Sequence, residues 1–491
     1  MVFNSFEFYL FFAAVVGIYF WLPHGWRWCM LLAASCYFYM AFVPAYILIL
    51  LATILIDYWA GILIEKSQGP KRKTFLIISI ISTCLVLFIF KYFNFFNANM
   101  SKLAEFLHWN YPVENLSILL PIGLSFHTFQ SLSYVIEVYR GRQKAERHFG
   151  IYSLYVMFFP QLVAGPIERP QNLLHQFYEK HSCDYARVTD GLKLMLWGMF
   201  KKTVIADRLA VVVDTVYGSP SEFTGVAYIV ATVFFAFQIY CDFSGYSDIA
   251  IGAAQVLGFR LMDNFNRPYF ARSVAEFWKR WHISLSTWFK DYLYIPLGGS
   301  RVAVPRMCLN LMITFVISGL WHGASWTYVI WGALNGALLV GSILTRDIRQ
   351  KWVKMTGLAS RPRLHRAVSV IITFTLICFT WIFFRADTVK DACMITGGIG
   401  HLFVQAATLD FSFLKDISKI ESWGINKFQF GIALVMIGVM EAMHMIQRHA
   451  NIRHMLRGMP VWQRWPIYYA FMFAIIIFGQ GNPKQFIYFQ F

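Results

Sequence analysis

"CLNLMITFVISGLWHGASWTYVIWGALNGALLVGSI", residues 308–343, decides how this chain must fold. The stretch is almost wholly apolar, and His322 is its only acidic or basic residue. About 20 mainly apolar residues cross a bilayer as a helix, so this run is too long to cross once and lie straight. We expect a break or a re-entrant bend at the histidine, which Gly319 and Gly323 flank. Irregular backbone at membrane depth persists only where it is buried in protein or lines a water-filled cavity.

The lone histidine has two interpretations. In a soluble protein, a core histidine satisfied by a backbone carbonyl would be the better explanation. Within a membrane, an ionisable side chain is costly and by default indicates function. We favour the functional interpretation of His322, because Trp321 and Trp326 flank it with bulky side chains that would exclude water.

The rest of the chain is similarly apolar. Of its 491 residues, 58% are hydrophobic and only 14% are charged, whereas about a quarter of the residues of a soluble domain are charged. This composition predicts an all-α polytopic membrane protein, a single domain over residues 1–491, with about 11 or more transmembrane helices and additional re-entrant or amphipathic helices. The candidate spans are 7–23, 26–42, 44–64, 74–93, 115–138, 150–165, 190–213, 225–249, 308–343, 367–384, 428–446 and 465–480.

The net charge of +17 comes largely from basic loops between spans and does not indicate a nucleic-acid partner. Four loops carry it: 66–73, 139–147, 345–366 and 447–464. The positive-inside rule places these loops in the cytoplasm, so the N-terminus and the C-terminal tail are expected on the outer face. Because no Lys or Arg precedes Arg27, we expect the first apolar stretch to remain as a span. We interpret the eight scattered cysteines as apolar side chains and expect neither a disulfide framework nor a metal site.

A second motif, "EFWKRWHISLSTWFKDYLYIPLGG" (276–299), has the periodicity of one amphipathic helix. His282 falls on its aromatic face, where a structural ring and a catalytic ring are about equally good interpretations. Lys279 and Arg280 fall on the opposite, cationic face, which could contact lipid phosphates or an anionic ligand.

A third motif, "FQIYCDFSGYSDIAIGAA" (237–254), holds Asp242 and Asp248. Carboxylates six residues apart do not share a helix face, which argues against an acid–base pair. We expect them to cap a helix break at Gly245 or to pair with a buried Lys or Arg. Asp57 receives the same interpretation, and we also interpret His127, in the motif 119–141, as a structural residue.

The last motif is the C-terminal tail, "NPKQFIYFQF" (482–491), which is too short to span a membrane. An exposed aromatic tail is unfavourable, so we expect it to fold back into a groove on the outer face. Tyr488 provides its only phenol. Physical reasoning alone favours a plug in which this hydroxyl is merely hydrogen-bonded.

Taken in order, six motifs resemble the membrane-bound O-acyltransferase (MBOAT) family, in the bacterial branch that modifies alginate, peptidoglycan and teichoic acid. They are "LLPIGLSFHTFQSLSYVIEVYRG", "FFPQLVAGPIERP", "YCDFSGYSDIAIG", "FWKRWHISLSTWFKDYLYIPLGG", "SGLWHGASW" and "WIFFRA". The resemblance implies the MBOAT fold around a central cavity, with the family's invariant histidine at His322 and its second histidine at His282. It also implies that Tyr488 carries an acyl group, since the tail resembles a motif that belongs to a small separate subunit in the teichoic-acid system.

The resemblance implies that the chain is an O-acetyltransferase of the bacterial inner membrane. It would take acetyl from cytoplasmic acetyl-CoA, a substrate and not a bound cofactor, and pass it to an extracytoplasmic polysaccharide. His322 would act as general base, and His282 would orient the acceptor or stabilise the oxyanion. A secreted acetyltransferase of the SGNH-hydrolase type is the implied partner.

The donor site is less well defined by the sequence. Lys201, Lys202, Lys279 and Arg280 are weak candidates for binding acetyl-CoA, and the alternative is that they mark the cytoplasmic interface. Two other functions remain open. One is D-alanyl transfer to teichoic acid from a carrier protein. The other is a proton-coupled transporter, which would usually show inverted repeats that this sequence lacks.

Overall fold

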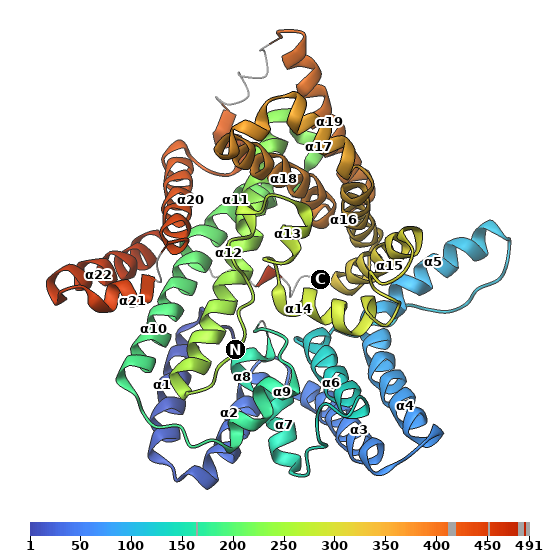
Figure 1. Cartoon of the computed structure of the whole chain (residues 1–491), viewed down its shortest axis with the longest axis vertical. Helices are drawn as coiled ribbons and strands as arrows, with labels where there is room; N and C mark the ends of the chain where they lie inside the picture. The colour runs from blue at the N-terminus through green and yellow to red at the C-terminus, as the bar shows by residue number, and fades with distance from the viewer. Residues whose placement is uncertain (164, 411–418, 450–451, 480–485, 488–491) are drawn as a thin grey trace. The chain divides into compact units, whose positions relative to one another are not determined.

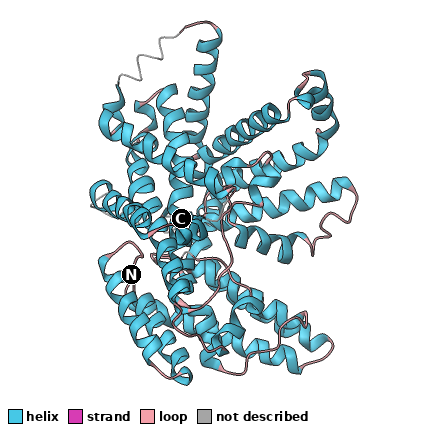
Figure 2. Ribbon diagram, turned by 60° about the vertical axis from the view of Figure 1, so that its left-hand side comes forward, coloured by secondary structure: helices cyan, strands magenta, loops and turns pink. Residues whose placement is uncertain are grey.

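The computed structural model describes residues 1–163, 165–410, 419–449, 452–479 and 486–487, and its regular structure within them is helical (Figures 1 and 2). No strand occurs among these residues. The all-α class predicted from the composition is therefore confirmed.

Contacts between Cα atoms divide the chain into two compact units. Unit 1 comprises Met1–Met195 and Ser247–Asp263, and unit 2 comprises Leu196–Tyr246 and Asn264–Phe491. Helices α10 (Tyr185–Met199) and α12 (Gly225–Leu257) each contain a point at which the chain passes from one unit to the other. The single membrane domain expected from the sequence stays a prediction.

Unit 1 contains nine α-helices in its described residues besides its parts of α10 and α12. They are α1 (Phe6–Trp21), α2 (His24–Met40), α3 (Ile47–Lys66), α4 (Pro70–Leu87), α5 (Phe93–Phe106), α6 (Leu124–Tyr139), α7 (Phe149–Met157), α8 (Phe159–Leu162) and α9 (Pro170–Leu173). The buried Asp57 of α3 accepts hydrogen bonds from the hydroxyls of Ser79, at 2.6 Å, and Thr83, both on α4. This satisfies the carboxylate without a basic partner.

The remaining helices belong to unit 2. They are α11 (Asp207–Gly218), α13 (Val274–Trp278), α14 (Ile283–Phe289), α15 (Val304–His322), α16 (Trp326–Leu344), α17 (Arg346–Met355), α18 (Pro362–Arg385), α19 (Val389–Ala407), α20 (Lys427–Gln447), α21 (Ile452–Gly458) and α22 (Val461–Phe478). A π-helical turn, η4 (Phe200–Ala206), joins α10 to α11.

Eight helical segments among the described residues are long and apolar enough to cross a membrane, and α1 is a shorter apolar helix. The eight are 44–66, 70–106, 225–257, 304–322, 326–344, 362–385, 427–447 and 461–478. Two candidate spans from the sequence are not continuous helices: α7 and α8 divide 150–165 at Phe158, and in 115–138 the helix, α6, begins only at Leu124. The chain is a multi-pass membrane protein.

The predicted break in 308–343 is confirmed. Helix α15 ends at His322 and α16 begins at Trp326. Gly323 follows in an extended conformation, and a Cβ atom on it would lie 2.2 Å from ring carbons of Tyr328. Ser325 then caps α16 by accepting the backbone N–H of Thr327 at 3.3 Å. Glycine and a hydroxyl cap together fix the turn beside the histidine.

Candidate functional site

His322 is the last residue of α15, and its side chain is 3% exposed. Among the described residues, three aromatic rings pack against the imidazole: Trp331 at 4.9 Å between centroids, Trp321 at 5.0 Å and Phe384 at 5.4 Å. The Trp331 and imidazole planes are inclined at 87°, the edge-to-face arrangement that aromatic pairs favour. The ring therefore lies in a largely apolar shell.

The sequence identified only part of this shell. Trp321 packs on His322 as expected, but Trp326 is 53% exposed and does not form the second wall. Trp331, more than one helical turn further along α16, packs against His322 instead. Its ring stacks on Trp381 of α18, with 5.7 Å between centroids and 16° between planes. A signal for Trp381 and Phe384 existed, since both belong to the quoted motif "WIFFRA".

The second histidine lies in a segment that the sequence predicted incorrectly. Residues 276–299 do not form one amphipathic helix, because α13 ends at Trp278 and α14 begins only at Ile283. His282 separates them with a left-handed backbone, at φ 43° and ψ 56°. The cause is a distant residue, Asn264. Its side-chain oxygen lies 3.1 Å from Nδ1 of His282 and accepts the hydroxyl of Ser284 at 2.9 Å.

These contacts define the chemical state of His282. The ring is 1% exposed, and burial lowers its pKa to about 3, so the imidazole is neutral. Because the oxygen of Asn264 can only accept, Nδ1 of His282 donates to it and carries the hydrogen. Nε2 is then the basic nitrogen. A ring in this tautomer can orient a hydroxyl by accepting from it, but it offers no donor at Nε2 to an oxyanion.

One tryptophan links the two histidines. The ring of Trp321 lies 6.4 Å from that of His282 and 5.0 Å from that of His322, measured between centroids. All three residues belong to unit 2. The structure thus brings together the two histidines that the sequence singled out, although 276–299 and 308–343 are separate motifs.

Lys201 and Lys202 are buried within the protein, at 2% and 1% exposure. The expectation that they mark the cytoplasmic interface stays a prediction. The ammonium of Lys202 lies 2.8 Å from a carboxylate oxygen of Asp207 and 2.6 Å from one of Asp242. Lys201 donates to the hydroxyl of Ser244 at 2.8 Å. The predicted pairing of Asp242 with a buried base is confirmed.

The alternative expectation for Asp242, a helix break at Gly245, is wrong. Helix α12 runs unbroken through Gly245. Gly245 instead allows α12 to pack closely against α10, because a Cβ atom there would lie 2.8 Å from the carbonyl oxygen of Gly198.

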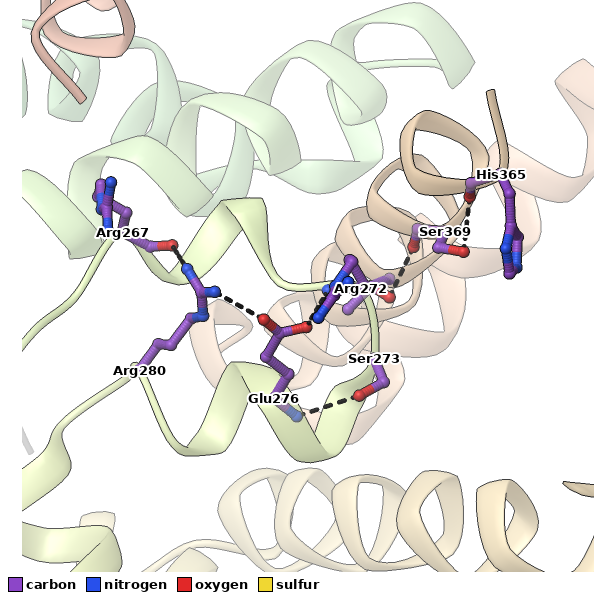
Figure 3. A network of polar contacts seen from close by, with 8 residues as sticks. Arg267, Arg272, Ser273, Glu276, Arg280, His365 and Ser369 are labelled. Carbon is purple, nitrogen blue, oxygen red and sulfur yellow. Dashed lines mark hydrogen bonds and ion pairs between the residues drawn. The ribbon is translucent and has the colours of Figure 1, made fainter. Parts of the chain in front are cut away.

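The other two basic candidates lie beside α13. Arg280 forms an ion pair with Glu276 at 2.6 Å, and Arg272 lies 3.3 Å from the same carboxylate (Figure 3). Arg280 also donates to the carbonyl of Arg267 at 3.5 Å. Lys279 is exposed. This cluster holds the loop 264–280 together around Glu276, and its arginines are only partly available to a ligand.

Tyr488 lies outside the described residues, but the two residues before it are described and buried. The ring of Phe486 packs against Tyr246 at 4.5 Å and Phe243 at 5.6 Å between centroids. Phe243 in turn contacts the ring of His282 at 4.6 Å. The backbone N–H of Ile487 donates to a carboxylate oxygen of Asp242 at 2.7 Å. One phenylalanine therefore touches both the tail and the second histidine.

Two further observations concern His127 and the possibility of a metal site. In unit 1, Nε2 of the buried His127 lies 3.2 Å from the hydroxyl of Thr53. Within the described part of the chain, no group of three or more His, Cys, Asp or Glu residues is placed to hold a metal ion.

Comparison with known proteins gives the family context of this site. The model of the membrane-bound O-acyltransferase family matches residues 147–386. This range includes His282, His322 and Lys202, whereas Tyr488 lies beyond it.

Three relatives illustrate the range of similar proteins. The chain is 38% identical to the probable alginate O-acetylase of Pseudomonas aeruginosa over 396 residues, which cover 80% of this chain and 73% of that protein. It is 34% identical to the peptidoglycan O-acetyltransferase of Helicobacter pylori, over 75% of this chain and 73% of the relative. It is 25% identical to the teichoic acid D-alanyltransferase of Bacillus subtilis, over 58% of this chain and 74% of the relative.

Proposed function

Because this chain belongs to the membrane-bound O-acyltransferase family, we propose that it is a membrane O-acetyltransferase that passes acetyl from acetyl-CoA toward an extracytoplasmic polysaccharide. The observation that carries the proposal is His322, buried in an aromatic shell within the matched range. The names of the relatives point to the group transferred. Identity is 38% with an alginate O-acetylase and 25% with a D-alanyltransferase, which favours acetyl.

The reaction is an acyl transfer from a thioester to a hydroxyl. The acceptor oxygen attacks the acetyl carbonyl, His322 takes the hydroxyl proton, and the new C–O bond forms as the C–S bond breaks. The leaving thiolate then receives the proton from His322, so the histidine is regenerated. Exclusion of water by Trp321, Trp331 and Phe384 would protect the thioester from hydrolysis.

His282 and the tail have proposed roles on the acceptor side. The basic Nε2 of His282 suits it to orient a hydroxyl, so we assign it that role in preference to oxyanion stabilisation. Tyr488 is the proposed acceptor, and an SGNH-hydrolase-like partner would move acetyl from it to the polymer. In this arrangement the protein lies in the bacterial inner membrane with both termini on the outer face.

A comparison of donors tests the proposal. The purified chain is reconstituted in liposomes and supplied with labelled acetyl-CoA or with a D-alanyl carrier protein, and its C-terminal peptide is analysed by mass spectrometry. We expect acetyl on the peptide that contains Tyr488 and none in Tyr488→Phe. D-alanyl in its place would favour the teichoic-acid function, and uptake of label without covalent transfer would favour a transporter.

A further inference from the structure

The buried cluster of Lys202, Asp207 and Asp242 has no part in the reaction described above. Its three side chains are each at most 3% exposed. The carboxylates of Asp207 and Asp242 lie 2.8 Å and 2.6 Å from the ammonium of Lys202. A buried charge is costly unless it is compensated by hydrogen bonds or by another charge.

The backbone of the tail supplies such a hydrogen bond. One oxygen of Asp242 pairs with Lys202 at 2.6 Å, and its other oxygen accepts the N–H of Ile487 at 2.7 Å. A hydrogen bond from a backbone N–H to a carboxylate is stronger than one between neutral groups. Asp242 thus uses both oxygens, one for a fixed side chain and one for the tail.

A second contact fixes the end of the helix that precedes the tail. Arg208, directly after Asp207, donates to the carbonyl of Phe478 at the end of α22 at 2.7 Å. Helix α22 also packs against η4, where the rings of Phe471 and Phe200 lie 5.0 Å apart. Contacts therefore hold the chain at Phe478 and again at Ile487, and they come from Arg208 and Asp242 of unit 2.

The side chain of Phe486 also holds the tail in place, through packing against aromatic rings. It is fully buried against Tyr246 and Phe243, and Phe243 and Asp242 are neighbours on α12. One turn of α12 therefore binds both the backbone and an aromatic side chain of the tail.

We propose that Asp242, held in place by Lys202, is a binding site for the main chain of the C-terminal tail and positions Tyr488 for acyl transfer. Asp242 is a positioning residue, since it touches the tail and not the reacting atoms. The role for Tyr488 rests on the proposed function, whereas the binding of the tail does not.

Two variants remove this hydrogen bond from opposite sides. Asp242→Asn leaves Lys202 paired with Asp207 in a neutral pair, so the fold should persist. Its single side-chain oxygen stays with the ammonium of Lys202, the stronger donor, so its amide nitrogen faces and repels the N–H of Ile487. Ile487→Pro deletes the N–H and leaves the charged cluster unchanged. The matched controls are Ile487→Val, which keeps the N–H, and Asp214→Asn, which removes a half-exposed ion-pair partner of Arg385.

Hydroxyl-radical footprinting of the full chain in detergent reports the result through oxidation of Phe486, whose side chain is buried in the native protein. We expect oxidation to rise at least about fivefold in Asp242→Asn and in Ile487→Pro as the tail opens locally. Both controls should stay at the native level. Native protection of Phe486 in Ile487→Pro, or in a folded Asp242→Asn, would overturn the proposal.

Footprinting requires no turnover, so it separates this inference from the proposed function. Exposure of Phe486 in both variants without acetyl on Tyr488 in the native chain would leave the binding site intact and refute the acyl role. Acetylation of Tyr488 together with unchanged protection in the variants would refute the binding site alone.

Discussion

His282 shows how one distant side chain determines a local conformation. Its left-handed backbone, at φ 43°, is uncommon for residues other than glycine, although Asn, Asp and His adopt it more readily than most. Such conformations persist where their surroundings hold them. Here Asn264 does so, because its side-chain oxygen engages both the ring of His282 and the hydroxyl of Ser284.

The buried ring of His282 predicts a pH-dependent stability. Its pKa is about 3 in the folded protein, against about 6.5 in an unfolded chain. Between these values the unfolded chain binds a proton that the folded chain does not. The contribution of His282 to the free energy of unfolding is therefore complete above pH ~6.5 and is lost below it, at about 1.4 kcal/mol per pH unit.

His282→Asn isolates this contribution, because asparagine tolerates the left-handed backbone and does not titrate. We expect the advantage of the native protein over the variant to shrink as the pH falls below about 6.5. Thermal unfolding in detergent at several pH values measures it. A stability difference that is the same on both sides of that pH would contradict the assignment.

Helices α15 and α16 position His322 through close contact of their backbones. A Cβ atom on Gly319 would lie 2.2 Å from the carbonyl oxygen of Tyr328 and 3.1 Å from the Cα of Gly332. Small residues permit such approach between helices in membranes. Because His322 lies less than one turn beyond Gly319, separation of the two helices would displace the imidazole.

Gly319→Ala should therefore lower stability by about 1–3 kcal/mol, as other overpacking substitutions do, and should reduce acetyl transfer. Gly341→Ala is the matched control, because it lies on α16 with no atom within 4 Å of the added carbon. Its effect should be neutral or stabilising by up to about 1 kcal/mol. Unfolding temperatures and transfer rates of the two variants provide the comparison, and equal behaviour would refute the role of the glycine contact.

The two motifs around these histidines differ in how far the sequence predicted them. The break at His322 was predictable because it depends on local features: a run too long for one crossing, and glycines beside an ionisable residue. The break at His282 was not, because it depends on Asn264, 18 residues away. Periodicity alone suggested one helix, and the long-range hydrogen bonds override it.

Across the whole chain, composition was sufficient to predict a multi-pass α-helical membrane protein, since few charges and long apolar runs admit no other class. Pairings between helices were only partly predictable. A buried base was expected for Asp242, yet Lys202 was interpreted as an interface residue, because nothing in the sequence shows that α12 and η4 bring the two together. Trp331 was missed for a similar reason, since its contact with His322 depends on the turn between α15 and α16.

The proposed function links these features into one path for an acetyl group. A thioester on one side of the membrane and a hydroxyl reached from the other require a water-poor meeting point with a base. In unit 2, His322 provides the buried imidazole, and His282 and the tail residues Phe486 and Ile487 are connected to it through Trp321 and Phe243.

The rate of acetyl transfer by His322→Ala tests this account most directly. The purified variant, in liposomes with labelled acetyl-CoA, is compared with the native chain and with His401→Ala, which removes an exposed histidine of α19. We predict that His322→Ala loses at least about a hundredfold in rate, the scale of general base catalysis, while it remains folded, and that His401→Ala keeps the native rate. A folded His322→Ala that transfers acetyl at close to the native rate would contradict the central claim.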